Sequence, residues 1–340
     1  MRALPTDPGA RRDLVVQLGL EAGLDRVGVT TADPFPDVEA ELRRRIEDGS
    51  KAGLTFTYNQ PDRSTDIRRS LPWAVSLIVA GRAYLPEAGS PETGVRSGRI
   101  ARFSVDDFYL PLRRGLEWIG SALVDAGHRA EILVDDNRLV DRAAAVRAGV
   151  GWWGKNSMVL APGQGPWMLL GSVATDAAVA PSERMSRDCG TCDACMPACP
   201  TGALTSPGIL DARLCLAAVL QTAGPIPEPL RVPMGDRIYG CDDCLDACPP
   251  GVRLLHRSTR PRGRVDLAWV LEASDDDLLG SFDRFYLPRR RPEILRRNAL
   301  IAAGNVGDRH LRRPVERYRN HADPILAEHA RWALARMPDA

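Results

Sequence analysis

Seven of the eight cysteines in this chain lie in two short runs, and their spacing constrains the fold more than any other feature of the sequence. The first run, from Cys189 to Pro200, has the order Cys-x-x-Cys-x-x-Cys-x-x-x-Cys-Pro. In bacterial iron–sulfur proteins with this spacing, three cysteines bind one [4Fe-4S] cluster and the fourth binds a second cluster. The second run, from Cys241 to Pro249, repeats the pattern without its first cysteine. The sequence therefore predicts a domain built around two clusters.

Crossing between the two runs distributes the cysteines over both clusters. The first cluster takes three ligands from the first run and one from the second, namely Cys189, Cys192, Cys195 and Cys248. The second cluster takes Cys199, Cys241 and Cys244 and needs a fourth thiolate, for which Cys215 is the only cysteine left. Eight cysteines thus fill eight ligand positions.

Zinc sites and disulfides are the alternative uses of so many cysteines. Zinc tetrads are built from paired Cys-x-x-Cys units, usually without a triplet, and a disulfide framework requires a secreted chain. The N-terminus lacks the apolar stretch of a signal peptide. No stretch approaches the roughly 20 apolar residues of a membrane span. We therefore expect a cytoplasmic protein without a membrane segment.

Length and charge suggest several units with different surfaces. A chain of 340 residues, 44% of them hydrophobic, is long enough for two or three folding units. The net charge is only +1, yet the chain from residue 250 onward has 18 arginines, no lysine and 12 acidic residues, a local balance of +6. Guanidinium groups match phosphate geometry, so this segment could bind a polyanion; an ordinary solvated surface is the equal alternative.

The first 180 residues have the pattern of an α/β unit with a mixed sheet. Apolar residues at helical spacing predict helices, and short apolar runs predict strands. Two apolar runs around a Pro-Gly-Gln-Gly-Pro segment predict a hairpin, and a stretch rich in Gly, Pro and Ser predicts a mobile loop. The expected helices are 11–22, 38–49, 109–126 and 139–148; the strands 26–30, 73–83 and 129–135; the hairpin 158–160 with 167–174; the loop 90–99.

The remaining chain divides into a ferredoxin-like two-cluster domain over 181–256 and a basic helical segment over 257–340. Short helices are expected at 265–279, 292–303, 312–319 and 324–337, separated by proline or glycine. Their pairing is similar to one helical repeat of the HEAT type.

Asp135 is the candidate acid of the first unit. It ends an apolar strand, the position at which α/β sheets usually bind ligands, and Arg142 follows in the next predicted helix. The alternative is a structural aspartate that caps that helix. Trp152 and Trp153 are expected in the core, with the lining of a flat cofactor as the second interpretation. A nicotinamide or nucleoside triphosphate site is disfavoured, because no strand leads into a glycine-rich phosphate loop.

Several motifs together resemble the epoxyqueuosine reductase family, and the resemblance covers nearly the whole chain. They are Val134-Asp135, Asp141-Arg-Ala143, the run from Arg147 to Asn156, the run from Gly235 to Cys244, and Arg297-Asn-Ala299 with Gly304-Asn305. The run Arg-Ile-Tyr-Gly-Cys-Asp-Asp-Cys after a four-cysteine run is the most specific of these.

The resemblance implies a cobalamin-dependent enzyme with two [4Fe-4S] clusters that removes the epoxide oxygen from epoxyqueuosine at the tRNA wobble position. It implies that Asp135 donates a proton, with Arg142 beside it. The implied partners are the tRNA anticodon stem-loop and an external one-electron donor of the flavodoxin or ferredoxin type, and the implied protein is a monomer. Positions that match the family's cobalamin contacts are Tyr58, Asp135, Ser157, Val159, Leu170, Asp242 and Asp243.

Two stretches depart from the family's pattern. Phe108-Tyr-Leu110 stands where the family has Asp-Tyr-His, and Leu216 to Thr222 replaces Ile-Ser-Tyr-Leu-Thr-Ile-Glu. Both changes remove polar groups near the expected substrate. Two further functions therefore stay open at this point: a cobalamin reductase acting on a small molecule, as reductive dehalogenases do, and an iron–sulfur electron carrier without catalysis.

Overall fold

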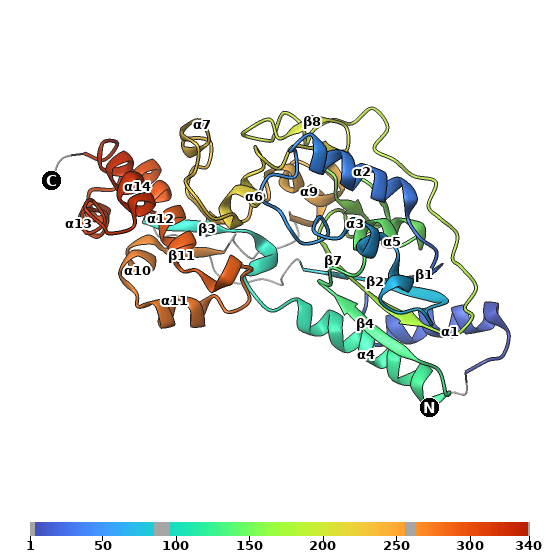
Figure 1. The fold of residues 1–340 in the computed structure, drawn as a ribbon. Helices are drawn as coiled ribbons and strands as arrows, with labels where there is room; N and C mark the ends of the chain where they lie inside the picture. The colour runs from blue at the N-terminus through green and yellow to red at the C-terminus, as the bar shows by residue number, and fades with distance from the viewer. Residues whose placement is uncertain (1–3, 85–95, 256–262, 339–340) are drawn as a thin grey trace.

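A four-stranded sheet with helices on both faces forms the larger lobe of the protein (Figure 1). The computed structural model describes residues 4–84, 96–255 and 263–338. The strand order is β1 (Arg26–Thr31), β2 (Ser76–Ala83), β7 (Met168–Thr175) and β4 (Ala130–Val134).

All three pairings in this sheet are antiparallel, so the expected mixed sheet is wrong for this lobe. The sequence did not specify which strands pair. β2 and β4 run in the same direction, but β7 lies between them and is antiparallel to both. A strand from later in the sequence thus separates β2 from β4.

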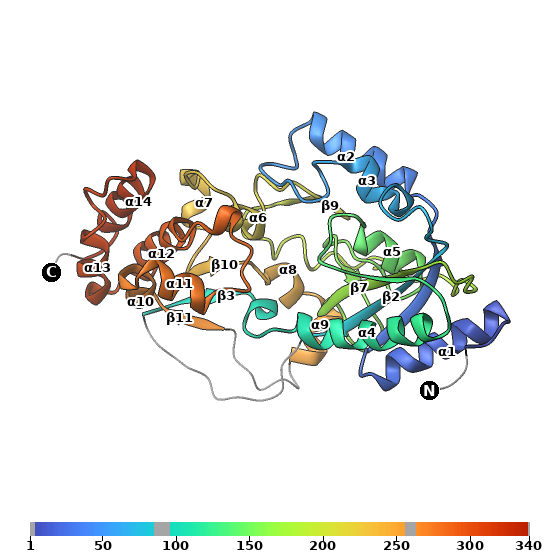
Figure 2. The same ribbon diagram turned by 60° about the horizontal axis from the view of Figure 1, so that its bottom comes forward.

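Alternate residues of the sheet enter two separate cores. In β2, Leu77 and Val79 belong to one core, and Ile78 and Ala80 belong to the other, as the two-residue period of a strand requires. Figure 2 shows the helices on the two faces. One face carries α1 (Pro8–Glu21) and α4 (Tyr109–Asp125), and the other carries α2 (Pro36–Glu47), α3 (Pro61–Thr65) and α5 (Asp141–Arg147).

A second, three-stranded sheet joins distant parts of the chain. Its order is β10 (Arg237–Tyr239), β3 (Ser97–Ile100) and β11 (Arg264–Asp266), with one parallel and one antiparallel pairing. These strands come from all three units expected from the sequence. The loop predicted for 90–99 is wrong at its end, where β3 begins; residues 90–95 lie outside the described part of the chain.

Ion pairs between neighbouring segments hold the second sheet together. They explain why strands so distant in sequence pair with one another. Asp236 accepts hydrogen bonds from the guanidinium groups of Arg99 and Arg264, one residue from each of the two neighbouring segments. Burial acts to raise the pKa of Asp236, but the hydrogen bonds and charges of both arginines lower it below its usual value. The carboxylate is therefore held in its charged form between them.

The cysteine-bearing chain lies between the two lobes (Figure 1). Its elements are short: β8 (Leu204–Ser206), β9 (Ile209–Leu210), α6 (Leu216–Gln221), α7 (Glu228–Arg231), α8 (Asp243–Asp246) and α9 (Pro249–Leu255). The predicted hairpin is wrong: β6 (Val159–Leu160) pairs with β5 (Trp152–Trp153), and β7 joins the main sheet. Only an isolated bridge between Ala161 and Gly165 links the two expected arms.

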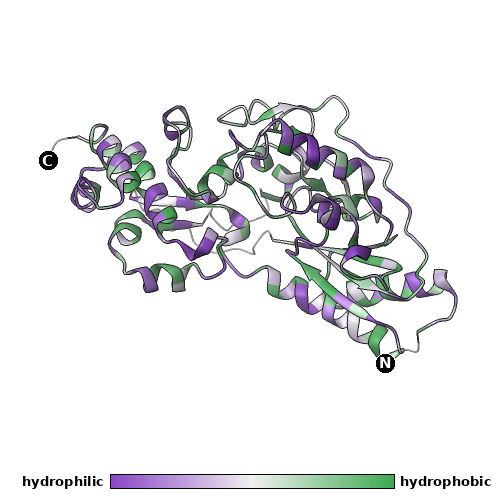
Figure 3. Cartoon of the chain, viewed as in Figure 1, coloured by the Kyte–Doolittle hydropathy of each residue, from purple (hydrophilic) through white to green (hydrophobic). Residues whose placement is uncertain are grey.

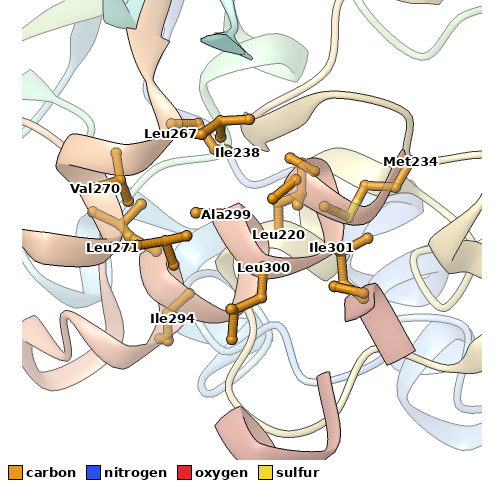
Figure 4. Close-up of a cluster of buried hydrophobic side chains, with 14 of the residues drawn as sticks. Leu220, Met234, Ile238, Leu267, Val270, Leu271, Ile294, Ala299, Leu300 and Ile301 are labelled. Carbon is orange, nitrogen blue, oxygen red and sulfur yellow. The ribbon is translucent and has the colours of Figure 1, made fainter. Parts of the chain in front are cut away.

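Five helices build the C-terminal lobe around α12. They are α10 (Leu267–Glu272), α11 (Asp275–Ser281), α12 (Glu293–Val306), α13 (Arg312–Glu316) and α14 (Pro324–Leu334). This lobe also contains 3-10 turns at Pro288–Arg290 and Arg309–Leu311. Two others lie earlier in the chain, at Ile67–Arg69 and Arg102–Ser104. Figure 4 shows the core between these helices, with Ala299, Leu300 and Ile301 of α12 among its members.

Helix ends in this lobe follow ordinary capping rules. Ser274 caps α11 by accepting from the backbone N–H of Asp277, and its hydroxyl also donates to the Asp277 carboxylate. Asp323 caps α14 ahead of Pro324, and Gly307 ends α12 in the left-handed conformation. Figure 3 shows hydrophilic and hydrophobic residues interleaved along the helices. Across the described ranges, no helix combines the length and apolar content needed to cross a membrane.

Candidate functional site

None of the eight cysteines forms a disulfide, and those assigned to the first cluster lie close enough for their charges to act on Cys248. Burial raises the pKa of Cys248 to about 11, and the charges of Cys189, Cys195 and Cys192 raise it further. Cys248 follows α8, whereas the other three belong to the first run. The fold thus brings the fourth cysteine across to the first three, as the crossed pattern predicts.

The other four cysteines form a second group. Burial raises the pKa of Cys241 to about 12, and the charge of Cys215 contributes. Burial also raises the pKa of Cys244, as do the charges of Cys241, Cys215 and Cys199. Among the described residues, no three Cys, His, Asp or Glu side chains converge closely enough to hold a single metal ion. Two groups of four thiols are the donor sets that two [4Fe-4S] clusters need.

Buried residues of α12 hold the segments that carry the second group. The amide nitrogen of Asn298 donates to the carbonyls of Leu220 and Ile238, both at 2.8 Å. Leu220 lies in α6, which begins directly after Cys215, and Ile238 lies in β10, which ends before Cys241. Asn298 is fully buried. One side chain therefore fixes the distance between two ligand-bearing segments.

The neighbouring arginine makes a parallel set of contacts. Arg297 donates to the carbonyls of Thr222 at 2.7 Å and Val219 at 3.1 Å, in and after α6. Burial lowers its pKa to about 10, and the charge of Arg291 adds to this effect. Arg297 is only 3% exposed. The arginine-rich segment thus contributes to the cluster region as well as to the surface, which the local charge did not indicate.

Asp242 and Asp243, two of the expected cobalamin contacts, are both engaged by arginines. The Asp242 carboxylate accepts from the backbone N–H of Arg102 at 2.8 Å and pairs with its guanidinium. Asp243 pairs with Arg237 of β10. Both carboxylates therefore hold the chain around Cys241 and Cys244 in place.

Asp135 lies directly after β4 in a left-handed backbone conformation, with φ of 51°. Such a conformation costs a residue other than glycine of order 1 kcal/mol, and it is found mainly at functional sites. Although the residue as a whole is exposed, burial of its carboxyl group raises the pKa of Asp135, and the charge of Asp136 raises it further. A group of this kind retains a transferable proton at higher pH than an ordinary aspartate.

Arg142, the second predicted catalytic residue, is linked to Asp135 through two other groups: after burial, the charges of Asp135 and Arg142 act in opposite directions on the pKa values of Asp141 and Tyr109. Its Nη1 donates to the carbonyl of Ser157 at 3.3 Å. Ser157 also has a left-handed conformation, with φ of 61°. The structure therefore joins Arg142 to one of the expected cobalamin contacts through the backbone.

Sequence reasoning missed a second carboxylate and a phenol at the same place. Asp141 begins α5, and its Oδ1 atom is buried without a hydrogen-bond partner. Burial raises the pKa of Asp141 well above its usual value, and the charge of Asp135 raises it further. Burial and the charges of Asp135 and Asp141 likewise raise the pKa of Tyr109. The sequence carried a signal for both: Asp141 lies within one of the motifs shared with the family, and Tyr109 is the matching residue of Phe108-Tyr-Leu110, where the family has Asp-Tyr-His.

The carboxylate site adjoins the second group of cysteines. The charge of Arg142 acts on the pKa of the Cys215 thiol, against the larger effect of burial. Burial raises the pKa of Tyr239 to about 12, and the charge of Asp135 contributes. Tyr239 precedes Cys241 by two residues. A candidate proton donor and a candidate electron source therefore lie in one neighbourhood.

The other expected cobalamin contacts border one core. Tyr58 and Leu170 are half-buried against it, and Val159 is one of its buried members. Two buried polar atoms nearby, Oδ1 of Asp141 and Nδ2 of Asn156, have no partner in the protein. Buried polar atoms normally have hydrogen-bond partners, so a ligand with amide side chains, such as a corrin, fits these residues.

Comparison with known proteins finds relatives for the cysteine-bearing region and for nearly the whole chain. The family described as the 4Fe-4S double cluster binding domain matches residues 188–251. The epoxyqueuosine reductase of Bacillus cereus is 30% identical over 95% of this chain and 88% of its own length. The epoxyqueuosine reductase of Xanthomonas campestris is 31% identical over 97% of this chain and 96% of its own length.

Solved structures agree with these relatives. The structure of epoxyqueuosine reductase from Streptococcus thermophilus superposes with a TM-score of 0.86 at 29% identity, covering 96% of this chain and 90% of that one. A crystal structure of epoxyqueuosine reductase with an epoxyqueuosine-modified tRNA-Tyr stem loop gives a TM-score of 0.87 at 28% identity, with the same coverage.

Proposed function

This chain belongs to the epoxyqueuosine reductase family, and from that membership we propose that it reduces epoxyqueuosine to queuosine at the wobble position of tRNA. It is an oxidoreductase that binds iron–sulfur clusters. The observation that carries the proposal is Asp135, whose pKa is raised by burial and whose charge acts on Tyr239, two residues before Cys241, while the charge of Arg142 acts on Cys215. These effects support Asp135 as the proton donor.

The reaction replaces an epoxide by an alkene and releases its oxygen as water, which consumes two electrons and two protons. Cobalamin, when bound, would supply the low-valent metal chemistry that opens the epoxide. Asp135 donates a proton to the departing oxygen. Arg142 offsets the negative charge that remains on the carboxylate, since an opposite charge within a few ångströms favours the ionised form.

The chain's own residues would hold the corrin. Tyr58, Val159 and Leu170 offer apolar contact along one core, and Ser157 and Asn156 offer polar contact. The left-handed turn at Ser157 is supported by Arg142. Asp242 and Asp243 would act indirectly. Their bonds to arginines hold in place the stretch of backbone that lies between the second cluster and this site.

Electrons would pass from the first cluster to the second. Cys192 is exposed, whereas Cys241, Cys244 and Cys215 are not. We assign the entry of electrons from an external flavodoxin- or ferredoxin-type donor to the first cluster for this reason. The second cluster, beside Asp135 and Arg142, would deliver them one at a time.

The C-terminal lobe would bind the tRNA anticodon stem-loop. α12 and α14 pack against each other, which supports the proposed HEAT-type pair, and exposed arginines precede α12. The proposed division of the chain is an α/β unit over 1–180, a cluster unit over 181–256 and a helical unit over 257–340. β3 belongs to the first unit by sequence but pairs with strands of the other two units in the second sheet. A monomer acting on tRNA in the cytoplasm completes the proposal.

The test is single-turnover reduction of an anticodon stem-loop that contains epoxyqueuosine, with anaerobically reconstituted, cobalamin-loaded protein. Formation of queuosine is expected, and about eight irons per chain should be present, as two cubanes require. The matched variant Cys215→Ala should lose one cluster and the activity but keep the other cluster. No product with both clusters and cobalamin present would refute the assigned reaction, and Cys215→Ala with eight irons would refute the ligand set.

A further inference from the structure

Trp152 and Trp153 are adjacent but lie in opposite environments. Trp153 is 46% exposed, whereas Trp152 is 8% exposed and its Nε1 atom is buried without a hydrogen-bond partner. A buried indole N–H usually has a partner, and leaving a buried donor unpaired costs about 1–3 kcal/mol. The Trp152 N–H therefore needs an acceptor that the described part of the chain does not provide.

Cys248 is the neighbour that identifies this acceptor. Trp152, Leu160 and Cys248 form a small buried cluster of their own, against which Met185 packs. Cys248 is the ligand that crosses from the second run to the first cluster in the proposed assignment. The unpaired indole N–H thus lies in the same buried cluster as a thiolate ligand.

The surrounding contacts fix the position of the indole. β5 pairs with β6, so that Trp152 lies opposite Leu160. The guanidinium carbon of Arg187 lies 5.7 Å from the centre of the Trp152 ring, within the range of a cation–π contact. Because strand pairing holds the backbone and the arginine covers the ring, the N–H has little freedom to find another acceptor.

The same segment of chain also touches the first cysteine run. The ammonium group of Lys155 donates to the carbonyl of Gly190 at 2.7 Å, between Cys189 and Cys192. Its charge acts on the Cys195 thiol against the larger effect of burial. Trp152 and Lys155, three residues apart, therefore border the first cysteine group from the side of the α/β lobe.

We infer that the indole N–H of Trp152 donates a hydrogen bond to a sulfur atom of the first [4Fe-4S] cluster, on the side of Cys248, and that this bond raises the reduction potential of that cluster. The inference rests on the ligand set of the proposed function. Hydrogen bonds to cluster sulfurs are among the determinants of potential. The bond is stronger to the reduced cluster, whose sulfurs carry more negative charge, so it favours entry of the single electron. No covalent bond is made or broken.

The experiment compares Trp152→Phe with Trp153→Phe in the full-length, cluster-loaded protein. Phe keeps an aromatic ring but removes the N–H. A hydrogen bond that is stronger by about 1.4 kcal/mol to the reduced cluster than to the oxidised one changes the one-electron equilibrium about tenfold, or about 59 mV, and removing the N–H removes this preference. In an anaerobic redox titration followed by electron paramagnetic resonance, the first cluster of Trp152→Phe should shift downward by this amount. Trp153→Phe should not shift.

The first cluster is identified as the wave that disappears in Cys192→Ser. An unchanged potential in Trp152→Phe with eight irons present would overturn the inference and leave the proposed function intact. Absence of that cluster from the unmutated protein would instead overturn the proposed ligand set.

A second measurement decides the case in which Trp152→Phe loses the cluster. The reduced, unmutated protein labelled with indole ¹⁵N should show a ¹⁵N hyperfine coupling in pulsed resonance, and Trp153→Phe should retain it. No such coupling would refute the hydrogen bond.

Discussion

Individual residues of the site differ in how far their sequence context could predict them. The two cysteine groups were predictable because the spacing within each run is a local property, and that spacing also predicts the crossing of Cys248 to the first three cysteines. Asp135 was predictable from its position after a strand. The raised pKa values of Asp141 and Tyr109 were not, since they come from burial by segments distant in sequence. Trp153 is exposed, so the expectation of two core indoles is wrong for one of them.

Asp135→Asn should separate proton transfer from binding. The amide cannot donate a proton in the same way, so single-turnover reduction should fall by roughly 10²–10⁴-fold, the usual contribution of a general acid. Because ionising a partly buried carboxyl group is unfavourable, the neutral amide should not lower the thermal midpoint. Binding of cobalamin and stem-loop, measured by spectral and fluorescence titration, should remain near normal. Full turnover in this variant would exclude the proton-donor role.

The pH dependence of turnover follows from the same carboxyl group. Burial, and then the charge of Asp136, raise the pKa of Asp135. The donating, protonated form therefore predominates below this raised pKa, and turnover should fall as the pH rises through it. Asp135→Asn should lack this decrease. A decrease at the same pH in both proteins would assign it to another group.

At the scale of elements, most helices and strands of the N-terminal lobe lie where the sequence predicted them, but their partners did not follow from it. In the C-terminal lobe, the helix expected at 265–279 is instead β11 followed by α10 and α11. The helices α1, α4 and α5 lie within a few residues of their predicted ranges. Hydrophobic period is local, whereas the insertion of β7 between β2 and β4 depends on contacts across the whole lobe. The pairing of β3 with two later segments has no local signal either. Sequence therefore predicted the class of the N-terminal lobe but not its strand directions.

Gly304 allows α12 and α14 to pack closely, and this close packing can be tested. A Cβ atom at Gly304 would lie 2.8 Å from the Cα atom of Ala333 and 3.0 Å from the Trp332 ring. Gly304→Ala gains about 1 kcal/mol of helix propensity but adds overpacking that typically costs about 1–3 kcal/mol. Gly280→Ala in α11 is the matched control, because nothing lies within 4 Å of its added Cβ.

The measurement is the thermal midpoint of both variants, taken anaerobically with the clusters in place. Gly280→Ala should be as stable as the unmutated protein or more so, and Gly304→Ala should be less stable than Gly280→Ala. Equal midpoints would show that the two helices can separate at Gly304 without cost.

At the scale of the whole molecule, the positive charge of the C-terminal lobe has two separate uses. Arg296 and Arg297 are buried and bind Asp275 and backbone carbonyls, so they cannot also bind phosphate. The interpretation of the arginine-rich segment as a polyanion-binding surface therefore does not extend to these two. Arg289 and Arg290 are exposed, and within the described chain no hydrogen bond or ion pair of their side chains is found. Both also have left-handed backbones, with φ of 56° and 50°.

We therefore expect Arg289 and Arg290 to contact the tRNA backbone. A double substitution by Ser should weaken stem-loop binding without changing cluster content. It should also flatten the log–log dependence of affinity on salt by about 0.7 to 0.9 for each phosphate that the variant no longer neutralises. The measurement is stem-loop affinity at several salt concentrations.

The double variant Arg317→Ser with Arg319→Ser removes the same charge from the same lobe and serves as the control. These two arginines are exposed but already paired with Glu272 and Glu316. If net charge alone attracted the tRNA, both double variants would decrease affinity and slope equally. If contact at the turn before α12 is responsible, only Arg289 and Arg290 should change the slope, because counterions are released only where phosphates are neutralised.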